Sequence, residues 1–423
     1  MMNNPPKAAA AKFEQAEARL PARLLYSIAV GIICPVIKWQ YNVKIKRIDM
    51  DKVNAPFILL SNHCSRLDWI YTAMAVKPCQ LNAVITRYFY SNPKLKVWLD
   101  RVGAIAKDQF TPDVPAVKKI MKTVRMGGNI MLFPEGRTSP AGLSETFEYS
   151  TIKLLRHMKV PVVAVKMEGS YLSMPKWNAS KRRGRVDLTV TPLFLPEEYD
   201  TLSDDEMFRR MCRVLATDEF AWESREKVAF RCRHFAKGLD GVLYQCPRCG
   251  KELVTLSDDH SIWCSSCGNG ARLNNYYGFE PFGEDCVIPE NIAQWFQWQV
   301  EQVREHIASD PDLELRSKLT MLHSDGKKWL TEVGSGEARL NREGFFYSGT
   351  RNGEPCEIHV PLASLPAIPY NPNESIDIYS EGEAFTFKPE NGQESQRWSI
   401  YAEQLHEHYI ASGRASKARG LEF

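Results

Sequence analysis

The sequence predicts an α/β domain with a mostly buried sheet flanked by helices, followed by a small cysteine-rich module and a small β-rich domain. Three observations support this prediction. Apolar strand-like and amphipathic helix-like segments alternate from about residue 40 to residue 200. Four later cysteines fall in two close pairs. Short segments of alternating polarity then fill much of the chain after residue 313.

Composition is that of a folded protein, with 44% apolar and 25% charged residues in a chain of 423, which is too long for one ordinary domain. The net charge of +3 is too weak to indicate a nucleic-acid binder. Two basic clusters with interleaved aromatic residues, 38–47 and 176–185, suit phosphate groups. Taken alone, each is better explained as a solvated surface patch. The 11 cysteines, an odd number without a secretory signal, favour a reducing compartment.

Residues 1–45 are predicted to form an N-terminal helical segment that lies in a membrane interface. Its beginning has no signal-peptide pattern and is expected to be a flexible lead. The apolar run 24–38 is shorter than the ~20 residues that span a bilayer, and Pro35 is expected to break it. Basic and aromatic residues at its edges match the headgroup layer, which predicts membrane association on the cytoplasmic face. A soluble core helix is the alternative.

Residues 46–240 are predicted to form the α/β domain. Near-continuous apolar strands indicate a sheet buried on both faces, and ligands gather at the strand ends of such sheets. The charged, helix-periodic stretch 202–240 is expected to close the domain. Strands are expected at 53–62, 81–86, 104–108, 129–136, 161–167 and 185–195, and helices at 67–76, 92–103, 113–128 and 146–158.

His63 and Asp68 follow the first of these strands. If a helix begins near Ser65, the Asp68 carboxylate can face back toward the imidazole. A carboxylate on one ring nitrogen fixes the tautomer and leaves the other nitrogen as a base for a substrate hydroxyl. No Gly-x-Ser-x-Gly elbow is partnered with this pair, and Cys64 is expected to point away from its neighbour. The alternative is that Asp68 caps a helix and His63 fills a turn.

A second polar motif, Phe-Pro-Glu-Gly-Arg-Thr-Ser at 133–139, follows another apolar strand. Gly136 permits a tight turn, and Arg137 can bind a phosphate with two parallel hydrogen bonds. Glu135 is expected to accept from a substrate hydroxyl or to steady the arginine. Thr138 and Ser139 are expected to donate to an anion or to cap the next helix.

Together the two motifs resemble the glycerolipid acyltransferase family, which includes lysophosphatidate acyltransferase. Asn62, His63 and Asp68 match the family's Asn-His-x4-Asp block, and 133–139 matches its third block letter for letter. The apolar segment 160–170 is similar to the fourth block. The second block, Gly-x-Ile-x-x-x-Arg, differs here because Gln109 replaces the arginine, for which Lys107 or Arg101 would have to substitute. The resemblance covers about residues 20 to 220.

The resemblance implies an O-acyltransferase of phospholipid biosynthesis. It would move an acyl group from acyl-CoA or acyl-ACP to the hydroxyl of a lysophospholipid in a membrane, most often 1-acyl-glycerol-3-phosphate, without a cofactor. His63 would be the general base, Asp68 would orient it, and no covalent acyl-enzyme would form. The substrate-binding residues would be Asn62, Glu135, Gly136, Arg137, Thr138 and Ser139. A tafazzin-like transacylation between phospholipids is a narrower alternative.

Residues 241–275 are predicted to form a zinc ribbon. The spacing Cys-x2-Cys, 14 residues, Cys-x2-Cys, with a glycine after each pair, suits a closed tetrahedral site with a structural zinc ion. Disulfides or a redox pair are poorer explanations. The expected ligands are Cys246, Cys249, Cys264 and Cys267. A nucleic-acid-binding zinc ribbon is a second hypothesis for the protein, but the ribbon has few basic residues, so no nucleic acid is expected.

The remaining chain is predicted to comprise a helical linker (276–312), a β-rich domain (313–412) and a basic tail (413–423). The order of short strands followed by one helix resembles a pleckstrin-homology or GRAM-like fold, which implies docking to a membrane or a protein. The strands are expected at 337–349, 355–365, 375–382 and 384–390, and the helix at 394–410.

Overall fold

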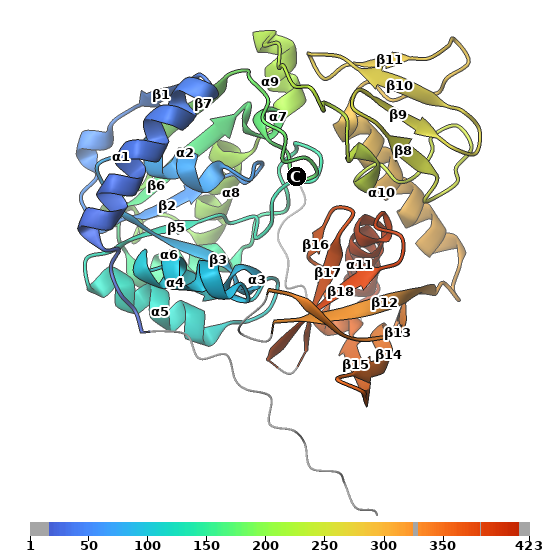
Figure 1. Cartoon of the computed structure of the whole chain (residues 1–423). Helices are drawn as coiled ribbons and strands as arrows, with labels where there is room; N and C mark the ends of the chain where they lie inside the picture. The colour runs from blue at the N-terminus through green and yellow to red at the C-terminus, as the bar shows by residue number, and fades with distance from the viewer. Residues whose placement is uncertain (1–16, 325–328, 381, 414–423) are drawn as a thin grey trace, which may run out of the picture.

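The computed structural model describes residues 17–324, 329–380 and 382–413. The predicted flexible lead and almost all of the predicted basic tail lie outside the described residues. The described chain forms an α/β domain, a small cysteine-rich sheet and a β-rich C-terminal domain that closes with a helix (Figure 1). The predicted fold class is therefore confirmed.

The α/β domain is built on a seven-stranded sheet in the order β1-β7-β6-β2-β5-β3-β4. The strands from β6 across to β4 run parallel to one another. Strand β7 is antiparallel to β6, and β1 pairs parallel with β7. The strands are β1 (Val43–Arg47), β2 (Ile58–Ser61), β3 (Leu81–Thr86), β4 (Ile105–Lys107), β5 (Asn129–Leu132), β6 (Val162–Glu168) and β7 (Val186–Phe194).

Helices cover both faces of this sheet because its central strands are apolar on both sides. On β2, Ile58 and Leu60 pack with α5, α6 and α8, whereas Leu59 packs with α1 and α2 on the opposite face. The helices are α1 (Arg23–Gln40), α2 (Asp68–Ala75), α3 (Arg87–Tyr90), α4 (Pro93–Arg101), α5 (Val114–Arg125), α6 (Ser150–Met158), α7 (Ser170–Ser173), α8 (Asp204–Leu215) and α9 (Glu219–Glu226).

One expectation about a helix was wrong. Helix α1 continues through Pro35 instead of breaking there. Proline removes one backbone donor, but Cys34 packs into the core beneath the helix and holds it in place. The stretch 202–240 forms α8 and α9 and then leaves the helix at Lys227, which has a left-handed backbone conformation (φ 51°). Beyond that point the chain packs its aromatic side chains around Tyr277 instead of continuing a helix.

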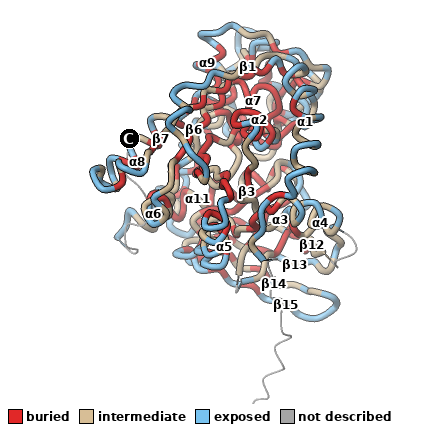
Figure 2. The backbone as a smooth tube through the Cα atoms, turned by 90° about the vertical axis from the view of Figure 1, so that its left-hand side faces the viewer, coloured by how far each residue is buried: buried red, intermediate tan, exposed pale blue. Residues whose placement is uncertain are grey.

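Helix α1 lies on the outside of the α/β domain, and much of its length is exposed (Figure 2). Its exposed apolar residues recur at helical spacing and form an apolar stripe, comprising Leu24, Ile28, Ile32, Val36 and Trp39. No helix in the described ranges combines the length and the apolar character needed to cross a membrane.

The cysteine-rich module is a four-stranded antiparallel sheet in the order β11-β10-β9-β8. Its strands are β8 (Thr255–Ser257), β9 (Ser261–Cys264), β10 (Gly270–Leu273) and β11 (Phe279–Pro281). Helix α10 (Ile292–Ser309) connects it to the C-terminal domain (Figure 1).

The C-terminal domain is a seven-stranded sheet in the order β15-β14-β13-β12-β18-β17-β16, covered by α11 (Glu394–Ala411). Strand β12 was not among the predicted strands because Ser317 interrupts its apolar side. In the fold, the Ser317 hydroxyl accepts a hydrogen bond from the Trp398 indole of α11. The strands are β12 (Leu315–His323), β13 (Thr331–Asn341), β14 (Gly344–Arg351), β15 (Glu354–Pro361), β16 (Tyr370–Asn371), β17 (Ser375–Ser380) and β18 (Glu383–Pro389).

Candidate functional site

The two polar motifs meet at one edge of the α/β sheet. Strands β2 and β5 are parallel neighbours, so the loops that leave their carboxyl ends lie side by side. The first loop carries His63, and the second begins at Phe133. The two rings stack with centroids 4.2 Å apart. The backbone N–H of Ser139 also donates to the His63 carbonyl, at 2.8 Å.

His63 and Asp68 are in direct contact. The imidazole Nδ1 lies 2.8 Å from Asp68 Oδ2. The same oxygen accepts from the backbone N–H groups of Cys64 and Ser65, each at 2.7 Å. Asp68 thus fixes both the turn before α2 and the imidazole, so the structural and the catalytic interpretations of the pair describe the same contacts. Burial raises the pKa of Asp68, and the hydrogen bond from His63 opposes this rise.

The other imidazole nitrogen faces Thr138. A carboxylate can only accept, so Nδ1 carries the proton and Nε2 is the basic nitrogen. The Thr138 hydroxyl lies 2.9 Å from Nε2 and donates to it. The His63 side chain is 23% exposed, which leaves this end of the ring within reach of solvent or substrate.

Glu135 holds the two loops together. Its carboxylate is buried, and its two oxygens accept from the backbone N–H groups of His63 (2.8 Å) and Glu145 (2.7 Å). Burial raises the pKa of Glu135 well above its usual range, while these two hydrogen bonds lower it. Glu135 therefore fixes the backbone of the His63 loop against the loop 133–145.

Asn62 and Ser139 are also held by the protein itself. The Asn62 amide donates to the Met167 carbonyl and accepts from the Met167 N–H, at 2.8 Å each, which ties the end of β2 to β6. The Ser139 hydroxyl accepts from the Gly142 N–H at 3.0 Å. Both residues are buried. In this arrangement they shape the loops and do not present a free polar group.

Gln109, which stands where the resemblance leads one to expect arginine, supports the turn at Gly136. Its side-chain amide donates to the Gly136 carbonyl at 2.6 Å. Gly136 has φ 71°, a conformation that favours glycine. The two suggested substitutes have other contacts, since Lys107 donates to the Asp108 carbonyl and Arg101 lies over the Trp98 ring.

Arg137 lies in the same loop as Thr138, which contacts His63, but its guanidinium is already paired with two carboxylates. Its Nε donates to Glu145 at 2.5 Å. Its Nη2 donates to both oxygens of Glu403, at 2.8 and 3.0 Å, and Glu403 comes from α11 of the C-terminal domain. The Arg137 side chain is only 14% exposed. Sequence reasoning missed both carboxylates, and Glu403 is 266 positions away along the chain.

The cysteine cluster is compact. The four sulfur atoms of Cys246, Cys249, Cys264 and Cys267 lie within 4.8 Å of one another. Two of the separations are 3.7 and 3.8 Å, close to the ~3.8 Å between sulfurs that each lie ~2.3 Å from a tetrahedral zinc ion. The glycines after the pairs, Gly250 and Gly268, have φ of 72° and 75°. The donor set and its geometry therefore fit zinc.

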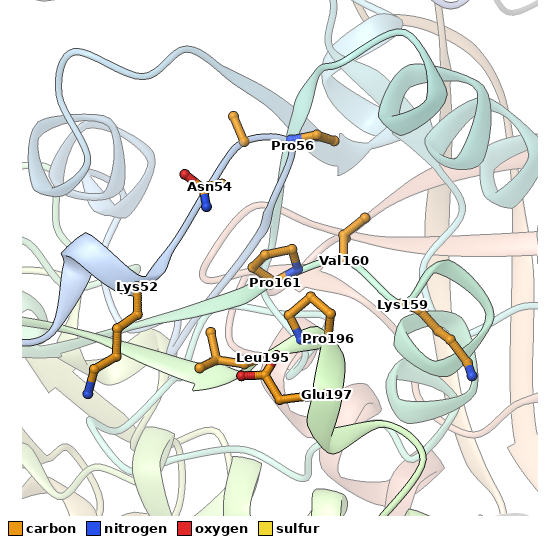
Figure 3. A pocket seen from close by; sticks show the side chains of 10 residues that line it. Lys52, Asn54, Pro56, Lys159, Val160, Pro161, Leu195, Pro196 and Glu197 are labelled. Atoms are coloured by element: carbon orange, nitrogen blue, oxygen red, sulfur yellow. The ribbon is translucent and has the colours of Figure 1, made fainter.

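A separate pocket of about 370 Å³ lies at the other end of the α/β sheet from His63. It opens near the starts of β2 and β6, whereas His63 follows the end of β2 (Figure 3). It is lined by Lys52, Asn54, Ala55, Pro56, Lys159, Val160, Pro161, Leu195, Pro196 and Glu197.

Comparisons with known proteins show that part of the chain is similar to acyltransferases. Residues 42–168 match the family model described as Acyltransferase. The chain is 25% identical over 155 residues to 1-acyl-sn-glycerol-3-phosphate acyltransferase BAT2, chloroplastic, from Brassica napus, a match that covers 36% of this chain and 44% of that protein. The chain thus spans less than half the length of this relative.

Among solved structures, a similarity is found to the crystal structure of the 1-acyl-sn-glycerophosphate (LPA) acyltransferase PlsC from Thermotoga maritima. The TM-score is 0.40 at 18% identity, and the match covers 48% of this chain and 81% of that one.

Proposed function

We propose that this protein transfers an acyl group from an acyl thioester to the hydroxyl of a lysophospholipid, a proposal supported by the match of residues 42–168 to the acyltransferase family model. The observation that carries the proposal is the 2.8 Å contact between His63 and Asp68. This pair lies beside the loop 133–139, whose Thr138 contacts the other imidazole nitrogen. The acceptor we propose is 1-acyl-glycerol-3-phosphate. The donor is acyl-CoA or acyl-ACP, and the reaction needs no cofactor.

In this mechanism, Nε2 of His63 removes the proton from the acceptor hydroxyl as its oxygen attacks the thioester carbonyl. The new C–O bond forms, the C–S bond breaks, and the proton passes from the imidazolium to the leaving thiolate. Asp68 stabilises the imidazolium and keeps Nδ1 protonated. Thr138, which donates to Nε2 in this structure, occupies the position that we assign to the acceptor hydroxyl.

Arg137 is the group that we assign to the acceptor's phosphate, because a guanidinium can donate two parallel hydrogen bonds to phosphate oxygens. Gly136 and Thr138 complete this loop. The remaining predicted substrate-binding residues, Asn62, Glu135 and Ser139, support the loop through the contacts described above. Arg137→Lys should therefore weaken the binding of acceptors that carry a phosphate, because a lysine ammonium cannot donate the two parallel hydrogen bonds of a guanidinium.

The test is acyl transfer by purified protein. A panel of lysophospholipids is offered with acyl-CoA and, separately, with acyl-ACP, and the lipid products are identified by mass spectrometry. A new phospholipid that appears only with a thioester supports the proposal. Acyl exchange between phospholipids without any thioester would instead support a transacylase, and no new lipid from any combination would refute the proposal.

We propose that the protein attaches to the cytoplasmic face of a membrane, and the exposed apolar stripe of α1 supports attachment to a membrane interface. Trp39 at the end of the stripe lies under the Arg183 guanidinium, 5.1 Å from its ring centroid, which brings the basic clusters 38–47 and 176–185 together. Exposed lysines beside an apolar helix favour an anionic lipid surface. An acceptor that resides in the bilayer would then be close to the site.

A structural zinc ion is the proposed occupant of the cysteine cluster. Four thiolates form a closed site, so the metal would stabilise the module and take no part in acyl transfer.

A further inference from the structure

The C-terminal domain places a carboxylate on the arginine that we assign to the acceptor's phosphate. Glu403 of α11 accepts from Nη2 of Arg137 through both oxygens, at 2.8 and 3.0 Å. Both side chains are largely buried, at 14% and 15% exposure. The same guanidinium also pairs with Glu145. A single positive charge therefore already faces two carboxylates.

Further contacts hold the C-terminal sheet against this side of the α/β domain. Lys176, next to the site, lies over the Tyr370 ring of β16, 4.2 Å from its centroid. The Thr86 hydroxyl lies 3.4 Å from the Tyr379 hydroxyl of β17. Figure 1 shows β16 and β17 on the side of the C-terminal domain that is turned to the α/β domain. The Glu403 contact is thus part of a docked interface and not an isolated side chain.

A phosphate and Glu403 cannot both occupy Arg137 favourably. With Glu145 in place, the guanidinium is already fully compensated, and a further anion in a buried site would be repelled by both carboxylates. A carboxylate also resembles a phosphate in that two oxygens on one central atom can accept parallel hydrogen bonds from a guanidinium. The docked domain therefore competes with an anionic acceptor for the same donor.

We propose that Glu403 holds the place of the acceptor's phosphate on Arg137, so that the C-terminal domain keeps the acceptor site closed until an anionic acceptor displaces it. This inference rests on the function proposed above. The acceptor can then bind only after the C-terminal domain has moved away from Arg137. Its apparent affinity therefore falls in proportion to the fraction of molecules in which the site is open. Weakening the Glu403 contact should raise that fraction without touching the catalytic pair.

The test compares Glu403→Gln with wild type and with a matched control, Glu407→Gln, one turn further along α11. Initial rates are measured with full-length protein at saturating oleoyl-CoA and varied 1-oleoyl-glycerol-3-phosphate. We expect Glu403→Gln to lower KM by roughly tenfold with kcat nearly unchanged, because the charge-assisted bond to Arg137 is lost. Glu407→Gln should leave KM unchanged. An unchanged or raised KM in a folded Glu403→Gln protein would overturn the proposal.

A second measurement separates failure of this inference from failure of the proposed function. Hydrogen exchange of segment 394–411 is followed on adding 1-oleoyl-glycerol-3-phosphate without donor, with 1-oleoyl-glycerol as the probe that lacks phosphate. Faster exchange with the phosphate-bearing lipid alone supports displacement of α11, even if no acyl transfer is found. Equal exchange with both lipids, in protein that does transfer acyl groups, would leave the proposed function intact. It would refute the proposal that the C-terminal domain closes the acceptor site.

Discussion

At the scale of single residues, His63 and its sequence neighbour Cys64 have opposite expected roles. Burial raises the pKa of the Cys64 thiol well above its usual range, which disfavours the thiolate that a nucleophile needs. We expect His63→Ala to lower kcat by about 100- to 10,000-fold, whereas Cys64→Ala retains most activity. Asp68→Asn should be impaired to an intermediate degree, because an amide can hold the wrong tautomer.

Steady-state rates check this prediction, with circular dichroism as the control for folding. A Cys64→Ala protein that is folded but inactive would contradict the role assigned to His63 and favour a thiol nucleophile.

Lys176 makes stability depend on pH. Burial lowers the pKa of its ammonium from 10.5 to about 7, with Arg137 adding repulsion and Glu145 opposing it. Between these two values the unfolded chain binds more protons than the folded one, so stability rises with pH through this window and is flat below it. Relative to Lys176→Met, wild type should gain about 2 kcal/mol between pH 7 and pH 9.

Urea denaturation of both proteins at pH 7 and pH 9 measures this difference. If the gap between their unfolding free energies stays constant, Lys176 keeps its proton in the folded state and the prediction fails.

At the scale of elements, the apolar stripe of α1 is expected to bind membranes. Ile28→Asp combined with Ile32→Asp should reduce sedimentation with anionic vesicles several-fold, because it removes apolar area from the interface and adds repulsion. Both residues are exposed, so the fold should persist. Ser27→Asp, an exposed position on the same helix, is the matched control for charge.

Salt gives an independent readout for the same helix. High salt should release wild type only in part, because apolar burial remains when electrostatic attraction is screened. Complete release by salt, or vesicle binding equal to wild type in the double variant, would contradict an apolar anchor.

At the scale of the whole molecule, the cysteine module braces the C-terminal helix that reaches the site. Glu252 of the module pairs with Arg397 of α11 at 2.7 Å and accepts from the Tyr401 hydroxyl at 3.0 Å. Gln393, just before α11, donates to the Thr255 carbonyl. A change at the cysteine cluster should therefore be felt at Glu403.

Replacing Cys246 and Cys249 with serine is expected to abolish zinc binding, to lower the thermal stability of the C-terminal half and to speed hydrogen exchange of 394–411. Cys286→Ser changes a cysteine outside the cluster and should behave like wild type. Metal analysis, calorimetry and hydrogen exchange measure the three effects. Unaltered exchange of 394–411 in the zinc-free protein would show that the module does not brace α11.

Much of the site could be predicted from sequence because its chemistry is local. His63 and Asp68 are separated by less than two helical turns, and the motif 133–139 directly follows an apolar strand. Once both strands lie in one parallel sheet, their loops must share an edge. The spacing did not reveal that Glu135 supports backbone N–H groups, because a carboxylate's partner depends on which atoms burial brings to it.

The sequence by itself determined the α/β class, the contact between His63 and Asp68 and the cysteine spacing, since each depends on periodicity or on residues close together in the chain. Tertiary structure alone decided that α1 continues through Pro35 and that β12 forms around Ser317, because packing overrides local propensity. It also brought Glu403 to Arg137 across 266 positions. No local pattern encodes that contact, because it arises only when the C-terminal domain packs against the α/β domain and the buried charges of both must find partners.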